Sequence, residues 1–512
     1  MKLPLATLLL SAALLPPQLT SAAPSPTSYY TDTFPQPGAP NLGDTVQPSL
    51  GNGGYEVRRY ALDVRVSSDL KNFTSVSTIQ ARTTQALSQF NLDLLDTTVK
   101  SVMVNDQPAR WVRVGEELQI RPPLTLRRKA NFTVRVTVQG EIPDREGARR
   151  LQTLAYGLIR AGDWLQTVPQ PSGAHRIAAL ADHPSQKAPA TITIVAPSHL
   201  NSISNGELVG EWRDPVDPAF TVRRFETGWK IAPELLQIGV GPFTIVRSAG
   251  PHGIKLRSVL PTDQLATMKP QLATIPEAIS FLEARLGPFP LRTYGIYVTP
   301  LGGDLETQSL AIFSFRELTP EGFRARDESR VVAHEISHEY FGNSVSPRRW
   351  SDVWLNEGHA QFYEYLWVEA HGGRKLDDTM RLIYARENQL VGRYGPVANP
   401  RRASFPDPYL APFSGLIYQG GSLALYALRQ EVGTATFEKI ERAWVTEHRN
   451  SVADTSDYIA LASRIAGRDL TAFMRPWLYE EKVPSMPGHS DWTVAPAAET
   501  PARPERQVSV SD

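Results

Sequence analysis

The 512-residue chain contains no cysteine. No disulfide can form and no lipid can be attached through a thiol, so the folded state depends on its apolar core alone. The chain also lacks net charge, since 53 Lys and Arg balance 53 Asp and Glu. This balance argues against nucleic acid as the main partner. The length is enough for two or three domains.

Long hydrophobic runs are scarce as well. The one candidate is at the N-terminus, where Lys2 precedes an apolar run from Leu3 to Leu15 and small residues follow at 20–23. This pattern predicts a removable targeting segment at 1–23, and therefore a secreted or periplasmic/extracellular protein. A membrane anchor is the alternative. The run is short for a span, and no later stretch suits one, so we expect no membrane span after signal cleavage.

Two common catalytic motifs are absent from the sequence, because neither Gly-x-Ser-x-Gly nor a P-loop occurs. What is present is His334-Glu335-Ile336-Ser337-His338. Histidines four apart lie on one face of a helix, about 5–6 Å apart at Cβ, and can share one tetrahedral metal ion. Glu335 lies slightly around the helix, where it can act on a water at the metal without displacing a ligand.

Glu357 follows His338 after eighteen residues. Gly342-Asn343 and Pro347 indicate that the first helix ends, and a second helix is predicted from about Ser351. Such a helix–loop–helix can fold Glu357 back as a third ligand, leaving the fourth position for water, as in catalytic zinc sites. The alternative is an amphipathic helix with two surface histidines.

The stretch from His334 to Gly358, with its Trp354-Leu355-Asn356-Glu357-Gly358 block, resembles the gluzincin aminopeptidases of the aminopeptidase N type. The resemblance covers about residues 51–488. It implies one Zn²⁺ per chain, held by His334, His338 and Glu357, with Glu335 as the catalytic base. His359 replaces the aromatic residue usual in the family, and we expect it to be a helix residue rather than a ligand.

Three further segments match the family in part. Gly303-x-x-Glu306 resembles the exopeptidase signature, which implies that Gly303 and Glu306 bind substrate and that the Glu306 carboxylate pairs with an α-ammonium. Tyr418 resembles the catalytic tyrosine that donates to the oxyanion. Gln170 resembles a glutamine that helps to bind the free amine. The alternatives are an ordinary loop glutamate, a core tyrosine and an exposed loop amide.

The chain is predicted to be an α+β protein of two domains. Alternating apolar residues between turn signals predict an N-terminal β-sandwich or β-saddle, and helical periodicity predominates after residue 326. The resemblance implies a thermolysin-like, mixed α/β and mainly helical catalytic domain. The expected order is a signal at 1–23, a flexible lead-in at 24–50, the β domain at 51–244, the zinc metallopeptidase domain at 245–483 and a disordered tail at 484–512.

The predicted function is a secreted zinc aminopeptidase that hydrolyses the N-terminal bond of peptides, acting as a monomer. Larger relatives carry a helical C-terminal domain over the cleft, and the length here predicts a more open site that admits longer peptides. Asp352 and Glu364 are candidate partners for the zinc-bound imidazoles. The alternatives are a thermolysin-type zinc endopeptidase and an inactive, zinc-stabilised binding protein.

Overall fold

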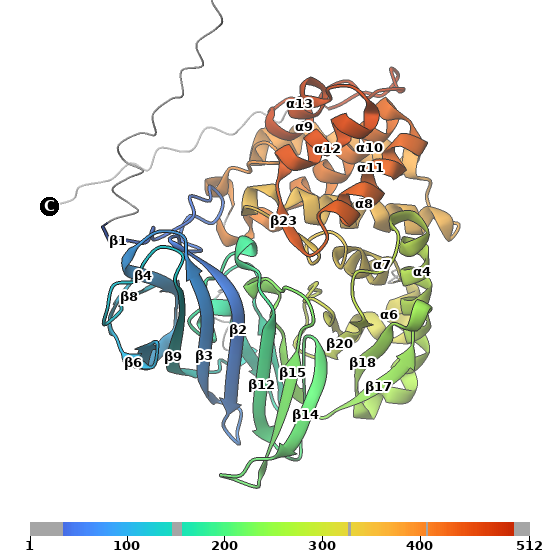
Figure 1. Cartoon of the computed structure of the whole chain (residues 1–512). Helices are drawn as coiled ribbons and strands as arrows, with labels where there is room; N and C mark the ends of the chain where they lie inside the picture. Colours follow the sequence, from blue (N-terminus) through green and yellow to red (C-terminus); the bar gives the residue numbers. More distant parts are fainter. Residues whose placement is uncertain (1–33, 146–155, 326–328, 406–407, 496–512) are drawn as a thin grey trace, which may run out of the picture.

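The structure is a computed structural model that describes residues 34–145, 156–325, 329–405 and 408–495. The β-rich N-terminal half and the mainly helical C-terminal half lie side by side (Figure 1). This arrangement confirms the predicted α+β class with two domains. The predicted targeting segment at 1–23 lies outside the described residues.

The N-terminal domain is built on an eight-stranded sheet. Its strands alternate buried and exposed residues along most of their length, as Tyr55–Val66 shows, so one face of the sheet packs on the core. The pairing is antiparallel except between β12 and β2. In sheet order, the strands are β14 (Glu207–Arg213), β15 (Phe220–Glu226), β12 (Ala190–Pro197), β2 (Tyr55–Val66), β3 (Asn72–Thr83), β9 (Asn131–Glu141), β5 (Thr97–Val104) and β6 (Gln107–Pro108).

Two four-stranded sheets complete this domain and share its apolar core. The strands of the first are β1 (Gln36–Pro37), β4 (Leu87–Asp93), β8 (Glu117–Arg121) and β7 (Arg110–Val114). Those of the second are β10 (Gly157–Ala161), β11 (Trp164–Val168), β16 (Ile238–Gly241) and β13 (Asn201–Ser204).

The second domain begins with a mixed sheet, which is then covered by helices. The sheet contains β17 (Phe243–Ala249), β18 (Lys255–Pro261), β20 (Ile296–Thr299) and β21 (Ala311–Ser314), and β19 (Thr293–Tyr294) pairs with β18. Some of its buried side chains form one core with the helices, and the rest pack into the core of the N-terminal domain. The main helices are α4 (Thr274–Leu286), α7 (Ser329–His338), α8 (Trp354–Ala370), α9 (Leu376–Tyr394), α10 (Gly421–Val432), α11 (Thr434–Glu447), α12 (Thr455–Ala466) and α13 (Thr471–Tyr479).

Helices α7 and α8 form the predicted helix–loop–helix. Helix α7 ends at His338, and Gly342 then takes a φ of 109°, which glycine adopts without the steric cost of a side chain. The chain passes through the short strand β22 (Val345–Pro347) and a 3₁₀ turn at Trp350–Asp352 before α8 begins. The connection brings the first turn of α8 beside the last turn of α7.

The expectation of a flexible lead-in is wrong for residues 34–50. Val46 and Leu50 are fully buried, and β1 pairs with β4. The carboxylate of Asp44 accepts hydrogen bonds from the backbone N–H of Val46 at 2.7 Å and of Trp350 at 2.5 Å. The proline and glycine content favoured flexibility, but these contacts with distant residues stabilise a segment whose regular secondary structure is limited to the short strand β1.

The expectation of a disordered tail is wrong for residues 484–495. Met486 is buried, and the Trp492 ring stacks on Tyr426 of α10 with centroids 5.9 Å apart. The N–H of Ala495 donates to the carbonyl of Ala385 at 2.8 Å. Residues 496–512 lie outside the described part of the chain.

Lys187 fastens the N-terminal domain to the loop after α7. Its ammonium is buried and donates to the carbonyls of Asn343 at 3.0 Å and Ser344 at 2.9 Å, and to the Ser346 hydroxyl at 3.0 Å. Burial lowers the pKa of Lys187 to about 7.

Within the described residues, no helix is both long and apolar enough to cross a membrane.

Candidate metal centre and substrate site

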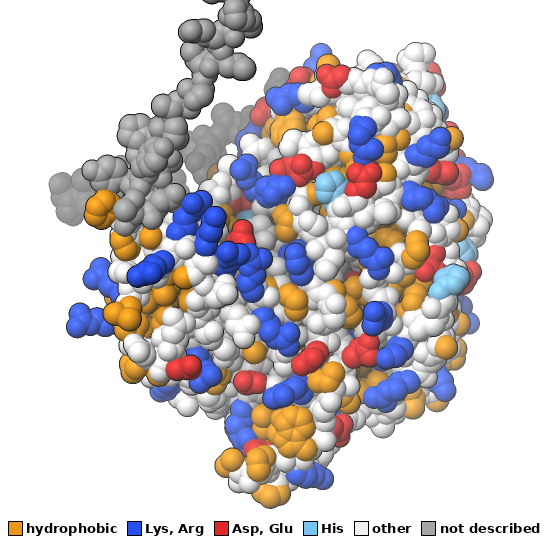
Figure 2. Space-filling view, in the orientation of Figure 1, with side chains coloured by type: hydrophobic (Ala, Val, Ile, Leu, Met, Phe, Trp, Pro, Cys, Tyr) orange, Lys and Arg blue, Asp and Glu red, His pale blue; other side chains and the backbone are white. Residues whose placement is uncertain are grey.

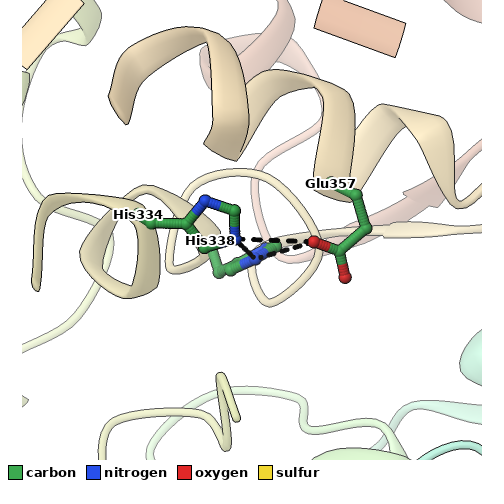
Figure 3. Close-up of side chains that lie close together, drawn as sticks. All are labelled: His334, His338 and Glu357. Atoms are coloured by element: carbon green, nitrogen blue, oxygen red, sulfur yellow. Dashed lines mark hydrogen bonds and ion pairs between the residues drawn. The ribbon is translucent and has the colours of Figure 1, made fainter. Parts of the chain in front are cut away.

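His334, His338 and Glu357 converge on one point between α7 and α8 (Figure 3). The two imidazole Nε2 atoms are 3.2 Å apart. Glu357 Oε2 lies 3.6 Å from His334 Nε2 and 3.3 Å from His338 Nε2. All three side chains are buried. The helical spacing that predicted this meeting is therefore realised in the fold.

These separations fit a tetrahedral zinc site. Ligand atoms about 2.0–2.2 Å from a zinc ion at tetrahedral angles lie about 3.4 Å from one another. The three observed edges of 3.2, 3.3 and 3.6 Å bracket that value. Glu357 Oε2 has no hydrogen-bond donor among the described residues, and two imidazoles with one carboxylate are a donor set that zinc prefers.

The other nitrogen of each imidazole is already engaged. His334 Nδ1 lies 3.0 Å from Glu364 Oε2, and His338 Nδ1 lies 3.2 Å from the Phe341 carbonyl oxygen. Acceptors at both Nδ1 atoms place the ring protons there, which leaves each Nε2 lone pair directed at the shared point. Glu364 also pairs with Arg330.

The electrostatics of the cluster favour positive charge. Burial opposes protonation of the imidazoles, but the carboxylates of Glu357 and Glu364 outweigh it and raise the pKa of His334 to about 10. Burial likewise opposes ionisation of Glu357, and the two histidines outweigh it and lower its pKa to about 2. The site therefore stabilises cations at the two Nε2 atoms, as a divalent metal requires.

Glu335 lies beside this point without taking part in the three-residue set. Its carboxylate lies within 4.8 Å of both a ring nitrogen of His338 and the Glu306 carboxylate. The side chain is 5 % exposed, and burial raises its pKa well above the ordinary value for a glutamate. A buried carboxylate with a raised pKa is suited to accept a proton and hand it on.

Tyr418 also lies beside the candidate metal ligands. Its ring stacks on the His334 imidazole with centroids 5.9 Å apart and planes 7° from parallel. It lies in a π-helical turn at Leu416–Gly420 that leads into α10. Burial, followed by the carboxylates of Glu357, Glu306 and Glu335, raises the pKa of Tyr418, so the phenol keeps its proton as a donor.

The N-terminal domain contributes to the same site through Gln170. Gln170 Nε2 donates to Glu306 Oε1 at 2.6 Å, and both side chains are buried. The backbone carbonyl of Glu306 accepts a hydrogen bond from Asn343 Nδ2 at 2.7 Å. Glu306 and Gln170 thus form an acidic, hydrogen-bonding wall near His338.

Gly303 lies in the irregular segment between β20 and β21, with a φ of 93°. Adding a side chain there would meet no atom within 4 Å but would force an unfavourable backbone conformation. This turn lies three residues before Glu306. The positive φ therefore explains why position 303 favours glycine. The predicted contact between Gly303 and substrate stays a prediction.

Two other sequence candidates lie outside the metal centre. Asp352 accepts hydrogen bonds from the N–H and hydroxyl of Thr455, so it is not a partner of either imidazole. His359 is fully buried, with its ring stacked on Phe341 at 4.3 Å and its Nε2 3.3 Å from Glu441. It is a helix residue and not a ligand, as expected.

Sequence reasoning missed Glu339 and Asn343. Glu339 Oε1 accepts the backbone N–H of Ser309 at 2.6 Å, and burial raises its pKa to about 8. Asn343 supports Glu306 from the loop after α7. The sequence shows only a glutamate directly after the second histidine, and the partner of Glu339 is 30 residues away in the sequence.

Comparison with known proteins agrees with this geometry. The Peptidase family M1 domain matches residues 303–477, and the Peptidase M1 N-terminal domain matches residues 56–232. The chain is 24 % identical over 431 residues to the Tricorn protease-interacting factor F2 of Thermoplasma acidophilum, covering 81 % of this chain and 52 % of that protein. It is 22 % identical over 452 residues to glutamyl aminopeptidase of Bos taurus, covering 82 % and 46 %.

The fold is also similar to a crystal structure of the M1 zinc metallopeptidase from Deinococcus radiodurans, with a TM-score of 0.73 at 23 % identity over 87 % of this chain and 98 % of that one. A mutant of that metallopeptidase, bound to a Tyr-Ser-Ala substrate, matches with the same TM-score at 24 % identity over 87 % and 99 %. The chain spans about half the length of the curated relatives it matches.

Proposed function

Because the chain belongs to peptidase family M1, we propose that it is a zinc-dependent aminopeptidase that removes the N-terminal residue of peptides. The observation that carries the proposal is the meeting of His334 Nε2, His338 Nε2 and Glu357 Oε2 at separations of 3.2–3.6 Å. Curated relatives with aminopeptidase activity in their names support it.

The residues around the metal point divide the work of peptide hydrolysis. His334, His338 and Glu357 would hold the zinc ion, which when bound polarises a carbonyl and lowers the pKa of water toward about 7. Glu335 then takes a proton from the attacking water and delivers it to the departing amine. Tyr418 donates its phenolic proton in a hydrogen bond to the developing oxyanion.

Glu306 and Gln170 favour an exopeptidase over an endopeptidase. The two side chains are hydrogen-bonded to each other, and the Glu306 carboxylate lies within 4.8 Å of the Glu335 carboxylate and of a ring nitrogen of His338. An α-ammonium held by this carboxylate would sit one residue from the metal, which places the first peptide bond there. An internal segment of a polypeptide has no ammonium to offset the buried charge of Glu306.

The proposal is tested with aminoacyl-chromophore substrates, their N-acetylated counterparts and metal analysis. We expect one zinc ion per chain, release of chromophore from the free-amine substrates, and little release from the acetylated ones. Glu335→Gln is expected to keep the zinc and lose activity by at least about a hundredfold. Equal cleavage of acetylated substrates would identify a thermolysin-type endopeptidase, and zinc without any cleavage would identify a binding protein.

We also propose that the protein is exported and acts outside the cytoplasm. The support is the sequence pattern of Lys2, the apolar run to Leu15 and the small residues at 20–23. Fractionation of the producing cell and N-terminal sequencing of the mature chain test this. A start near residue 24 is expected outside the cytoplasm, and an uncleaved cytoplasmic chain would refute it.

A further inference from the structure

Lys187 is a buried lysine at the contact between the two domains. On the face of the molecule in Figure 2, many Lys and Arg side chains lie at the surface, where water solvates their charge. Lys187 is only 6 % exposed. It directly follows the 3₁₀ turn at Pro184–Gln186 of the N-terminal domain. A buried amine needs hydrogen-bond acceptors from the protein, because it has lost those of water. The loop after α7 in the other domain supplies them.

The ammonium group joins three residues of that loop. Lys187 Nζ donates to the carbonyl oxygens of Asn343 at 3.0 Å and Ser344 at 2.9 Å, and to the hydroxyl of Ser346 at 3.0 Å. A longer contact of 3.4 Å reaches the carbonyl oxygen of Ser451. An ammonium has three protons, so the three short contacts use its full donor capacity. The loop therefore cannot shift against the N-terminal domain without breaking at least one of these hydrogen bonds.

Asn343 connects this loop to the residue that we assign to amine binding. Its Nδ2 donates to the backbone carbonyl of Glu306 at 2.7 Å, and its backbone N–H donates to the carbonyl of His338 at 2.9 Å. Gln308, two residues after Glu306, donates from Nε2 to the Asn343 carbonyl at 3.0 Å. Asn343 thus links the end of α7, where the metal centre lies, to the segment that contains Glu306.

Glu306 is held at two points, and both lead to the N-terminal domain. Its carboxylate accepts a hydrogen bond from Gln170 at 2.6 Å, and its backbone carbonyl accepts the one from Asn343. The first contact orients the carboxylate, and the second fixes the backbone from which that side chain extends. Gln170 contacts Glu306 directly, whereas Lys187 contacts only the Asn343 backbone.

We propose that Lys187 is a positioning residue for amine recognition, because by holding the Asn343 backbone it keeps the Glu306 carboxylate in place beside the metal centre. The inference rests on the proposed function, which assigns Glu306 to the α-ammonium of a peptide. Lys187 would touch neither the substrate nor the metal. Its loss would therefore weaken binding of the amine without removing a group that takes part in hydrolysis.

The test compares two competitive inhibitors of the zinc-loaded full chain. Leucinol contains an α-ammonium and no bond to hydrolyse, and 4-methylpentanol is its analogue without the amine. In Lys187→Met, which removes the donors and keeps a long side chain, Ki for leucinol should rise by about threefold or more. Ki for 4-methylpentanol and kcat should stay within about twofold of the wild type, with zinc affinity unchanged in chelator competition. A general loosening of the site would weaken both inhibitors alike.

A double-mutant cycle tests the route through Asn343. Asn343→Ala removes the hydrogen bond to Glu306, so adding Lys187→Met to it should change Ki for leucinol by less than about twofold. Lys230→Met is the matched control, because Lys230 is an exposed lysine of the same domain whose backbone N–H donates to Asn450 Oδ1 at 2.9 Å. Its Ki values should equal those of the wild type.

An unchanged Ki for leucinol in Lys187→Met, equal increases for both inhibitors, or fully additive effects in the cycle would overturn the proposal and leave the proposed function intact. A wild type that binds both inhibitors equally and cleaves acetylated substrates would overturn the two together. If Lys187→Met fails to fold, Ser346→Ala removes one acceptor of the ammonium and should still raise Ki for leucinol by about twofold. An unchanged value in that variant would also overturn the proposal.

Discussion

Replacing Glu364 should weaken zinc binding although this residue does not belong to the ligand set. Its carboxylate lies 3.0 Å from His334 Nδ1, is buried, and pairs with Arg330 on the other side. In Glu364→Ala the ring proton at Nδ1 loses its acceptor, and the ion pair with Arg330 is lost. The His334 ring then loses the hydrogen bond that fixes its tautomer and helps to direct Nε2 at the metal.

The size of the effect follows from the hydrogen bond. A buried, charge-assisted bond contributes about 1.5–3 kcal/mol, which corresponds to about 10–100-fold in zinc affinity. Glu364→Gln should lie at the low end of this range, because its amide oxygen can still accept from Nδ1 but carries no charge. Activity at saturating zinc should fall less than affinity at limiting zinc.

The measurement is competition for zinc against a chromophoric chelator, with circular dichroism to check the fold. Glu369→Gln is the control, since Glu369 lies on the same helix, is partly exposed and pairs only loosely with Lys375 at 3.7 Å. Zinc affinity of Glu364→Ala within about threefold of the wild type would refute the argument that Glu364 orients His334.

Three further substitutions test other parts of the structure. Tyr418→Phe should lower kcat by about 10²–10³-fold with zinc content unchanged, because one oxyanion donor is lost; an unaltered kcat in steady-state assays would exclude that role. Glu306→Gln should raise KM for free-amine substrates by about tenfold or more and leave zinc affinity near that of the wild type; equal KM values in the two proteins would contradict amine binding by Glu306. Burial raises the pKa of Glu387 on α9 from the ordinary value of 4.5 to about 8. Glu387 therefore keeps its proton in the folded state at pH values where the unfolded chain has lost it. The resulting contribution to the free energy of unfolding is complete below pH 4.5 and is lost as pH rises through about 8. Glu387→Gln should therefore raise the unfolding temperature at pH 9 and change it little at pH 4.5, and a gain that is the same at both pH values in thermal unfolding would refute this sign.

Local patterns predicted the metal centre because its geometry is largely local. His334 and His338 are one helical turn apart, and Glu357 needs only a reversal of the chain, which Gly342 and Pro347 indicate. The alternation in β2 and the apolar periodicity of α4 likewise identify a strand and a helix from short windows. These features could be predicted because inferring them requires no knowledge of contacts with distant residues.

Other features depend on contacts between distant residues, and the sequence could not predict them. From the sequence, Lys187 would be predicted to lie at the surface. In the fold it is surrounded by carbonyl acceptors of the loop after α7. Asp44 lies in a segment whose composition favours flexibility, and its hydrogen bond to Trp350 joins residues 306 apart. The π-helical turn at Tyr418 has no compositional signature, although such turns often mark functional sites.

The hydrogen bond between Gln170 and Glu306 joins the β-rich half of the molecule to the proposed amine-binding carboxylate of the helical half. Under the proposed function, the two halves together set the distance between the bound amine of a peptide and the metal centre. A small tilt of the β-rich half would shorten or lengthen that reach while leaving the metal ligands, all on α7 and α8, in place. Lys187 lies in the contact between the two halves. Substitutions there are therefore expected to shift which peptide bond is hydrolysed while the metal ligands stay in place.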